Sequence, residues 1–167
     1  MPAPFLNPLV PGLPPAVSAW VRGLEEVEEH LRKWAFELSE EAFWWRPAPG
    51  LNPIGGLVRH ILGSSHRLLR AGLPGELPEW ARLGREWELQ GPLEPKELVL
   101  ERFEAAWPRL VSEFRGLAGE DLARPVRVGQ LGAEAPLAHV LHHLVEHAQH
   151  HAGQIIYAHK LLQARIE

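Results

Sequence analysis

Four stretches of this chain carry apolar residues at the three- and four-residue spacing of one helical face, and this pattern restricts the possible folds more than any other feature. Each stretch follows or begins at a proline, which is favoured at a helix start because its missing N–H would have no partner there. We therefore predict helices over about residues 16–38, 53–71, 95–114 and 136–163. Four amphipathic helices in one small chain predict an all-α fold, a four-helix bundle.

Two long connections separate the later helices, over residues 73–92 and 117–136. Their length favours a bundle with long crossover connections over a simple up-and-down arrangement. Within the second connection, residues 125–128 are a candidate for a short extended segment.

The length of 167 residues fits a single domain, residues 1–167, with a sizeable core. A hydrophobic fraction of 46% and a charged fraction of 23% are ordinary for a soluble globular protein. The chain has no cysteine, which excludes disulfides, thiolate metal sites and cysteine nucleophiles.

The net charge of -4, with histidine neutral, lacks the basic character typical of proteins that bind nucleic acid. Arg59, Arg67 and Arg70 share one predicted helix, where such residues usually form a solvated face. The N-terminus lacks the basic and apolar regions of a signal peptide, and no apolar run approaches membrane-spanning length. We expect a cytoplasmic protein without nucleic-acid or membrane partners.

The last predicted helix places two of its histidines on the apolar side. At about 100° per residue, His151 lies about 20° from a seam centred on Leu144, and His147 lies about 60° to the same side. Gln154 lies beside them, at about 80°. Histidines four residues apart lie one turn apart on one face, where both can reach one metal ion. The alternative is that they are solvated or bonded within the protein.

A buried histidine pair needs partners for its ring nitrogens, and a divalent metal would supply them. The neighbouring Ala148 and Ala152 are small and leave room for a cavity. Two ligands do not fill a coordination shell, so a third is required. His60 and His66 lie at opposite edges of the apolar stripe of the second predicted helix, and periodicity does not choose between them.

Two motifs resemble the DinB/YfiT-like superfamily. They are Trp45-Arg46-Pro47, followed by a helix with His60, and the distant run His147-Ala148-Gln149-His150-His151-Ala152-Gly153-Gln154. Members of the superfamily share a four-helix bundle with a three-histidine site for a divalent metal, using one histidine of the second helix and an H-x-x-H-H-x-G-Q run on the fourth. The resemblance implies that His60, His147 and His151 bind zinc, nickel or iron.

The resemblance implies a metal-dependent enzyme that activates a small thiol or water, either similar to a thiol S-transferase or similar to a hydrolase. It also implies a small-molecule substrate such as a low-molecular-weight thiol, and a homodimer. Acid and base groups are scarce, since Asp121 lies in a connection and Glu146 and Tyr157 are predicted to face outward. Gln154 is a candidate for orienting a ligand histidine. The alternative is a non-catalytic, stress-response bundle that binds a metal or another ligand.

Overall fold

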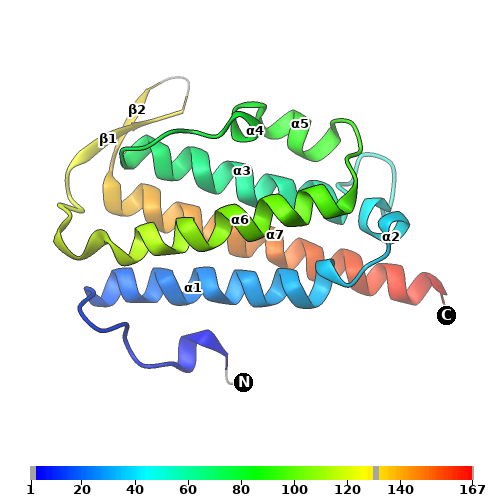
Figure 1. The fold of residues 1–167 in the computed structure, drawn as a ribbon, viewed down its shortest axis with the longest axis horizontal. Coiled ribbons are helices and arrows are strands. Elements are labelled where there is room, and N and C mark those ends of the chain that lie inside the picture. Colours follow the sequence, from blue (N-terminus) through cyan, green and yellow to red (C-terminus); the bar gives the residue numbers. More distant parts are fainter. Residues whose placement is uncertain (1–2, 130–131, 167) are drawn as a thin grey trace.

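The computed structural model describes residues 3–129 and 132–166, and four long helices in this part of the chain run side by side (Figure 1). They are α1 (Pro15–Leu31), α3 (Ile54–Gly72), α6 (Lys96–Arg115) and α7 (Leu137–Ile166). Helices α1 and α3 each pack against both α6 and α7. The all-α four-helix bundle predicted from the apolar spacing is therefore confirmed.

Several helix boundaries differ from the prediction, and α3, α6 and α7 each begin one residue after the proline expected to open the helix. Pro53 precedes α3 instead of being its first residue, and the carbonyl of Pro53 accepts a hydrogen bond from the N–H of Leu57 at 3.0 Å. The first helix ends earlier than expected, because α1 is followed by a π-helical turn over Arg32–Phe36. A separate short helix, α2 (Glu40–Trp44), then follows and is capped by Ser39, whose Oγ accepts a hydrogen bond from the N–H of Ala42.

The core lies between the four long helices and is made of the apolar side chains that the spacing assigned to their inner faces. Each helix contributes side chains with 0% exposure, among them Leu24, Ile61, Phe103, Trp107 and Leu144. Because burial of apolar area is the main favourable term in folding, these contacts hold the helices at fixed positions relative to one another.

The two long connections are structured. Helices α3 and α6 run in the same direction, so the chain returns along the bundle through α4 (Glu79–Arg82) and α5 (Gly84–Gln90), which cover α3 (Figure 1). The second connection stays at one end of the bundle. It forms an antiparallel hairpin of β1 (Pro125–Val128) and β2 (Ala133–Pro136), which confirms the predicted extended segment. Short 3-10 turns span Pro4–Leu6 and Leu117–Gly119.

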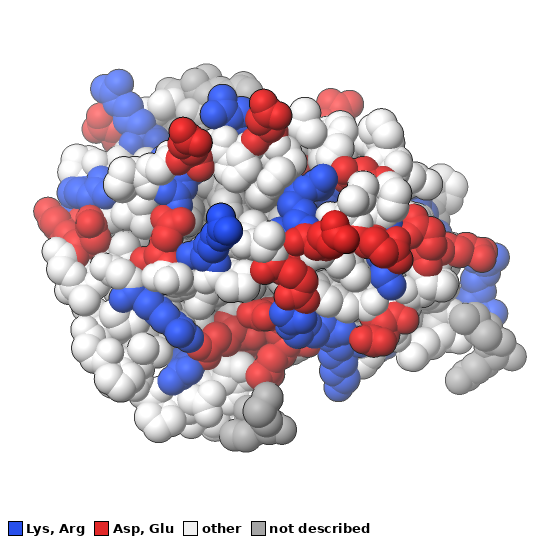
Figure 2. Space-filling view, viewed as in Figure 1, with Lys and Arg blue, Asp and Glu red and all other residues white. Residues whose placement is uncertain are grey.

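Acidic and basic side chains are interspersed on the face of the molecule shown in Figure 2. Some of these charges join different helices, as in the ion pairs of Arg32 with Glu104 and of Arg115 with Glu25. Within residues 3–129 and 132–166, no helix combines the length and the apolar character that a membrane span requires.

The side chain of Arg59 bonds the first connection to α3. Its side chain is only 2% exposed; its Nε donates to the carbonyl of Glu88 and its Nη1 to that of Pro92, both at 2.9 Å. It also pairs with Glu94 at 3.3 Å, and its guanidinium lies against the rings of Trp44 and Trp87. These contacts fix the segment that follows α5.

The expectation that Arg59, Arg67 and Arg70 form a solvated face is wrong. Arg67 pairs with Glu88 and Arg70 with Glu113, and the side chains of Arg67 and Arg70 are 29% and 11% exposed. The reason is tertiary, because the first connection lies over this side of α3 and supplies Glu88 as the partner of Arg67, while α6 supplies Glu113 as the partner of Arg70.

Replacing Arg59 with leucine is expected to lower the free energy of unfolding by about 3 kcal/mol, since it breaks a buried, multiply bonded ion pair. The matched control is Arg115→Leu, which removes an exposed pair and is expected to cost less than about 1 kcal/mol. Urea denaturation of both variants measures the difference. Equal losses would contradict the assigned role of Arg59.

Candidate metal centre

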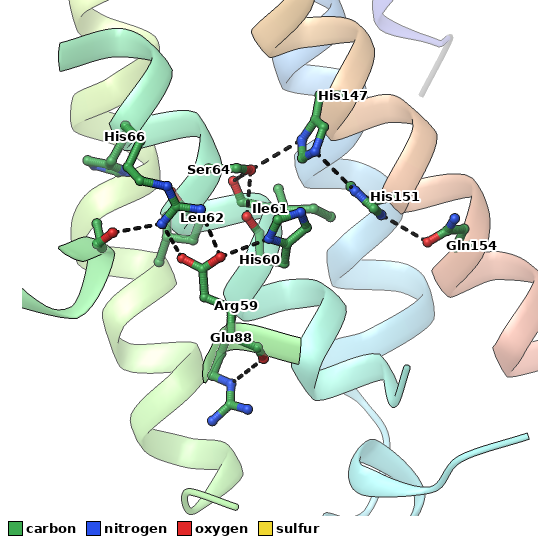
Figure 3. A network of polar contacts seen from close by, with 12 residues as sticks. Arg59, His60, Ile61, Leu62, Ser64, His66, Glu88, His147, His151 and Gln154 are labelled. Carbon is green, nitrogen blue, oxygen red and sulfur yellow. Dashed lines mark hydrogen bonds and ion pairs between the residues drawn. The ribbon is translucent and has the colours of Figure 1, made fainter. Parts of the chain in front are cut away.

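Three histidines from two helices meet between α3 and α7 (Figure 3). His60 comes from α3, and His147 and His151 come from α7. One ring nitrogen of each histidine lies within 4.8 Å of the other two. Among the described residues, this is the single group of three or more His, Cys, Asp or Glu side chains close enough to hold one metal ion.

The helices place these rings for simple reasons. His147 and His151 are one turn apart on α7, and their ring centroids are 4.4 Å apart. Ala148 and Ala152, both buried, leave the space beside them that larger side chains would fill. His60 faces the pair from α3, with ring centroids 5.0 Å from His147 and 4.7 Å from His151.

The structure brings His60, and not His66, to the pair on α7. His66 is also buried, but its Nδ1–H donates to the carbonyl of Leu62 at 2.9 Å and its ring packs against Trp80. Figure 3 shows His66 pointing away from the three histidines. The alternative that periodicity left open is thus decided by the packing of α3 against α7.

Glu88, on α5, orients His60. Its Oε2 lies 2.8 Å from Nδ1 of His60, and Arg67 donates to both of its oxygens, at 2.5 and 2.9 Å. Burial alone would raise the pKa of Glu88, but the bonds from Arg67 and His60 outweigh this effect and hold it below its usual value. An ionised carboxylate accepts from Nδ1–H of His60, which leaves the lone pair on Nε2.

The other two histidines have acceptors at the same ring position. Nδ1 of His151 lies 2.9 Å from Oε1 of Gln154, the residue expected to orient a ligand histidine. Nδ1 of His147 lies 3.2 Å from Oγ of Ser64. The Ser64 hydroxyl donates to the carbonyl of His60 at 2.6 Å, so its oxygen is free to accept from His147.

With all three Nδ1 atoms bonded outward, the three Nε2 atoms face one another. Nε2 of His147 and Nε2 of His151 are 3.2 Å apart. Nε2 of His60 is buried and has no hydrogen-bond partner. A buried polar atom without a partner is costly, and a metal ion would satisfy it. Two nitrogens bound to one tetrahedral zinc ion lie about 3.3 Å apart, so the donor set fits a divalent metal.

Burial makes the pair on α7 neutral at physiological pH. It lowers the pKa of His147 to about 3, with a further contribution from the charge of His151. Burial also lowers the pKa of His151 to about 4; the bond to Gln154 opposes this shift, while the charges of His60 and Arg85 add to it. Neutral imidazoles are the form that binds metals.

Helical periodicity did not identify Glu88 and Ser64 as neighbours of the histidines. Glu88 lies in a connection whose path has no periodic signal, and Ser64 is an ordinary helical serine until α7 packs against it. The sequence did contain one indication of a close neighbour at this position. Gly63 lies inside a helix, where glycine is unfavourable. A Cβ at Gly63 would overlap Oε1 of Glu88, so the glycine makes room for the carboxylate.

The other polar residues considered from the sequence lie outside the cluster. Asp121 is exposed and caps its own turn through the N–H of Ala123. Glu146 is exposed and lies 3.4 Å from His142, and Tyr157 is 66% exposed. None of these three side chains contacts the three histidines among the described residues.

A family model described as the DinB superfamily matches residues 23–155, a span that includes all three histidines and Glu88. No curated protein matches the chain.

Stability without metal is expected to fall as the pH is lowered from about 6.5 towards 4. In the unfolded chain, His147 and His151 both take up protons near pH 6.5, the ordinary value. In the fold their pKa values are about 3 and about 4, so the unfolded state binds more protons in this interval and is favoured. Above about pH 7 both states are neutral, and these residues contribute no pH dependence.

Urea denaturation in the presence of a chelator, at about pH 7 and about pH 5, measures this effect. The double variant His147→Gln/His151→Gln should lose less stability over the same interval. An equal loss in the variant would show that other groups cause the acid sensitivity.

Proposed function

The chain belongs to the DinB superfamily, and from this premise we propose that His60, His147 and His151 bind one divalent metal ion in a metal-dependent enzyme. The observation that carries the proposal is the convergence of three Nε2 atoms, one of them buried without a partner, while acceptors hold each Nδ1. Hydrogen bonds of this kind fix the ring orientation and the tautomer of metal-binding histidines.

Three neutral imidazoles favour zinc, nickel or iron over calcium or magnesium, which prefer oxygen ligands. Three protein ligands also leave part of the coordination shell open, as in catalytic rather than structural sites. His147 is the most accessible of the three side chains, since His60 and His151 are 2% and 7% exposed.

Among the described residues, we find no side chain at this site that is free to act as a nucleophile. The chain contains no cysteine, the Ser64 hydroxyl is bonded to a carbonyl, and Glu88 is held by Arg67 and His60. The attacking group must then be a small molecule. When bound, a divalent metal lowers the pKa of a coordinating thiol or water towards neutrality and so supplies a nucleophile.

A thiol transfer similar to that of S-transferases is the activity we favour, and hydrolysis is the related option. An apolar cavity of about 250 Å³ lies next to Gln154, between α7 and the segment before α3, and would hold the body of an electrophilic substrate. It is lined mainly by apolar side chains, including Leu51, Leu57, Tyr157 and Leu161. Gln154 joins this cavity to the metal-binding group through its bond with His151.

Untagged protein loaded with zinc, nickel or iron should hold close to one metal ion per chain by elemental analysis, and the variants His60→Ala, His147→Ala and His151→Ala should each lose it. A histidine tag would bind metal itself, so it must be absent. The matched control is His142→Ala, which removes an exposed histidine of the same helix that lies beside Glu146. Retention of metal in the three variants would rule out the proposed ligands.

The same preparations distinguish an enzyme from a binding protein. Metal-loaded protein is mixed with a panel of small thiols and electrophiles, and thiol consumption is compared with that of metal-free protein. Turnover that needs the metal supports the enzyme. Metal binding without turnover across the panel would favour the non-catalytic bundle.

Glu88→Gln is expected to weaken metal affinity by about 10- to 100-fold while the bundle stays folded, because the neutral amide no longer polarises His60. Gly63→Ala should act in the same direction by displacing the Glu88 carboxylate, although alanine favours the helix. Competition with a metal indicator measures both affinities. An unchanged affinity in both variants would mean that Glu88 has only a structural role.

A further inference from the structure

Four histidines follow one another at four-residue intervals along α7: His139, His143, His147 and His151. A four-residue step on an α-helix turns by about 40°, so such a row winds gradually around the helix. Here it runs from the surface into the core. His139 and His143 are exposed, His147 is half-buried, and His151 is buried.

The inner part of this row forms a continuous series of neighbouring rings. The ring centroids of His143 and His147 are 5.8 Å apart, and those of His147 and His151 are 4.4 Å apart. His147 therefore belongs to two pairs, an outer pair with the exposed His143 and an inner pair with the buried His151. Both pairs have the one-turn spacing that allows two imidazoles to share a metal ion.

Access to the proposed metal site is restricted on the inner side. His60 and His151 are 2% and 7% exposed, so an ion arriving from water meets His147 first. A hydrated divalent cation must also exchange water for protein ligands before it can enter a buried site. An exposed histidine next to His147 offers the first such exchange at the surface.

We propose that His143 and His147 form a surface capture site through which the divalent metal ion reaches His60, His147 and His151. His143 and His147 would hold the ion at the surface, and His151 and His60 would then take the place of His143 while His147 remained a ligand. This inference rests on the proposed metal site. It assigns to His143 a role that the final three-histidine site does not require.

The role has a distinct kinetic signature. Since His143 is absent from the final site, its loss leaves the dissociation constant unchanged. It removes a step shared by loading and release, so both rate constants fall by the same factor. A residue that instead shaped the final site would change the dissociation constant.

The test uses untagged, metal-free protein and zinc ions alone. Loading is followed by stopped-flow with a zinc indicator, release is followed by transfer to an excess of chelator, and the dissociation constant is measured separately at equilibrium. The test variant is His143→Gln. The control is His142→Gln, which removes another exposed histidine, one that lies beside Glu146 instead of the metal-binding group.

We expect His143→Gln to slow loading and release several-fold and equally, and His142→Gln to behave as the unaltered protein. Unchanged rates in His143→Gln, or a changed dissociation constant, would overturn the capture role while leaving the three-histidine site intact. Failure of the unaltered protein to bind zinc at equilibrium would overturn both proposals, and this is seen before any rate is measured.

Discussion

The geometry of the histidine cluster depends on the buried carboxylate of Glu88. Glu88 is 1% exposed, and a charge at that depth is tolerated because Arg67 and His60 both bond to it. Its position requires a glycine at residue 63 and a first connection held down by Arg59. Its hydrogen bond to Nδ1 of His60 turns Nε2 of that ring towards α7. The position of the first connection therefore sets the orientation of a histidine inside the bundle.

Burying the histidine cluster costs free energy of folding that an apolar core would not cost. Apolar residues at the same positions would need no partners, whereas three imidazoles need acceptors at Nδ1 and leave three Nε2 atoms facing one another. Lowered pKa values keep the pair on α7 neutral, so burial does not trap charge there at neutral pH. A bundle that keeps such a cluster in its core has a polar interior that is suited to a ligand rather than to stability.

Helical periodicity was enough to predict the four-helix bundle and the inward side of α7, because both are properties of a single segment. It gave His147 and His151 a shared face, and it placed Gln154 beside them. It failed where a residue's surroundings come from another part of the chain. Arg59 was expected in solvent, and the first connection buries it. The spacing of apolar residues also did not predict the π-helical turn after α1 or the short helix α2.

The residues on the inner faces of the helices follow from the amino-acid sequence alone, since the repeat of the α-helix makes the facing of a side chain a local property. The sequence left His60 and His66 equivalent, at the two edges of one stripe. Only the packing of α3 between α7 and the first connection separated them, by turning one edge towards His147 and His151 and the other towards Trp80. Contacts between distant segments decide which ring nitrogens meet. Periodicity predicts only the direction of each side chain around its own helix axis, and it does not predict which residues of other segments that side chain faces.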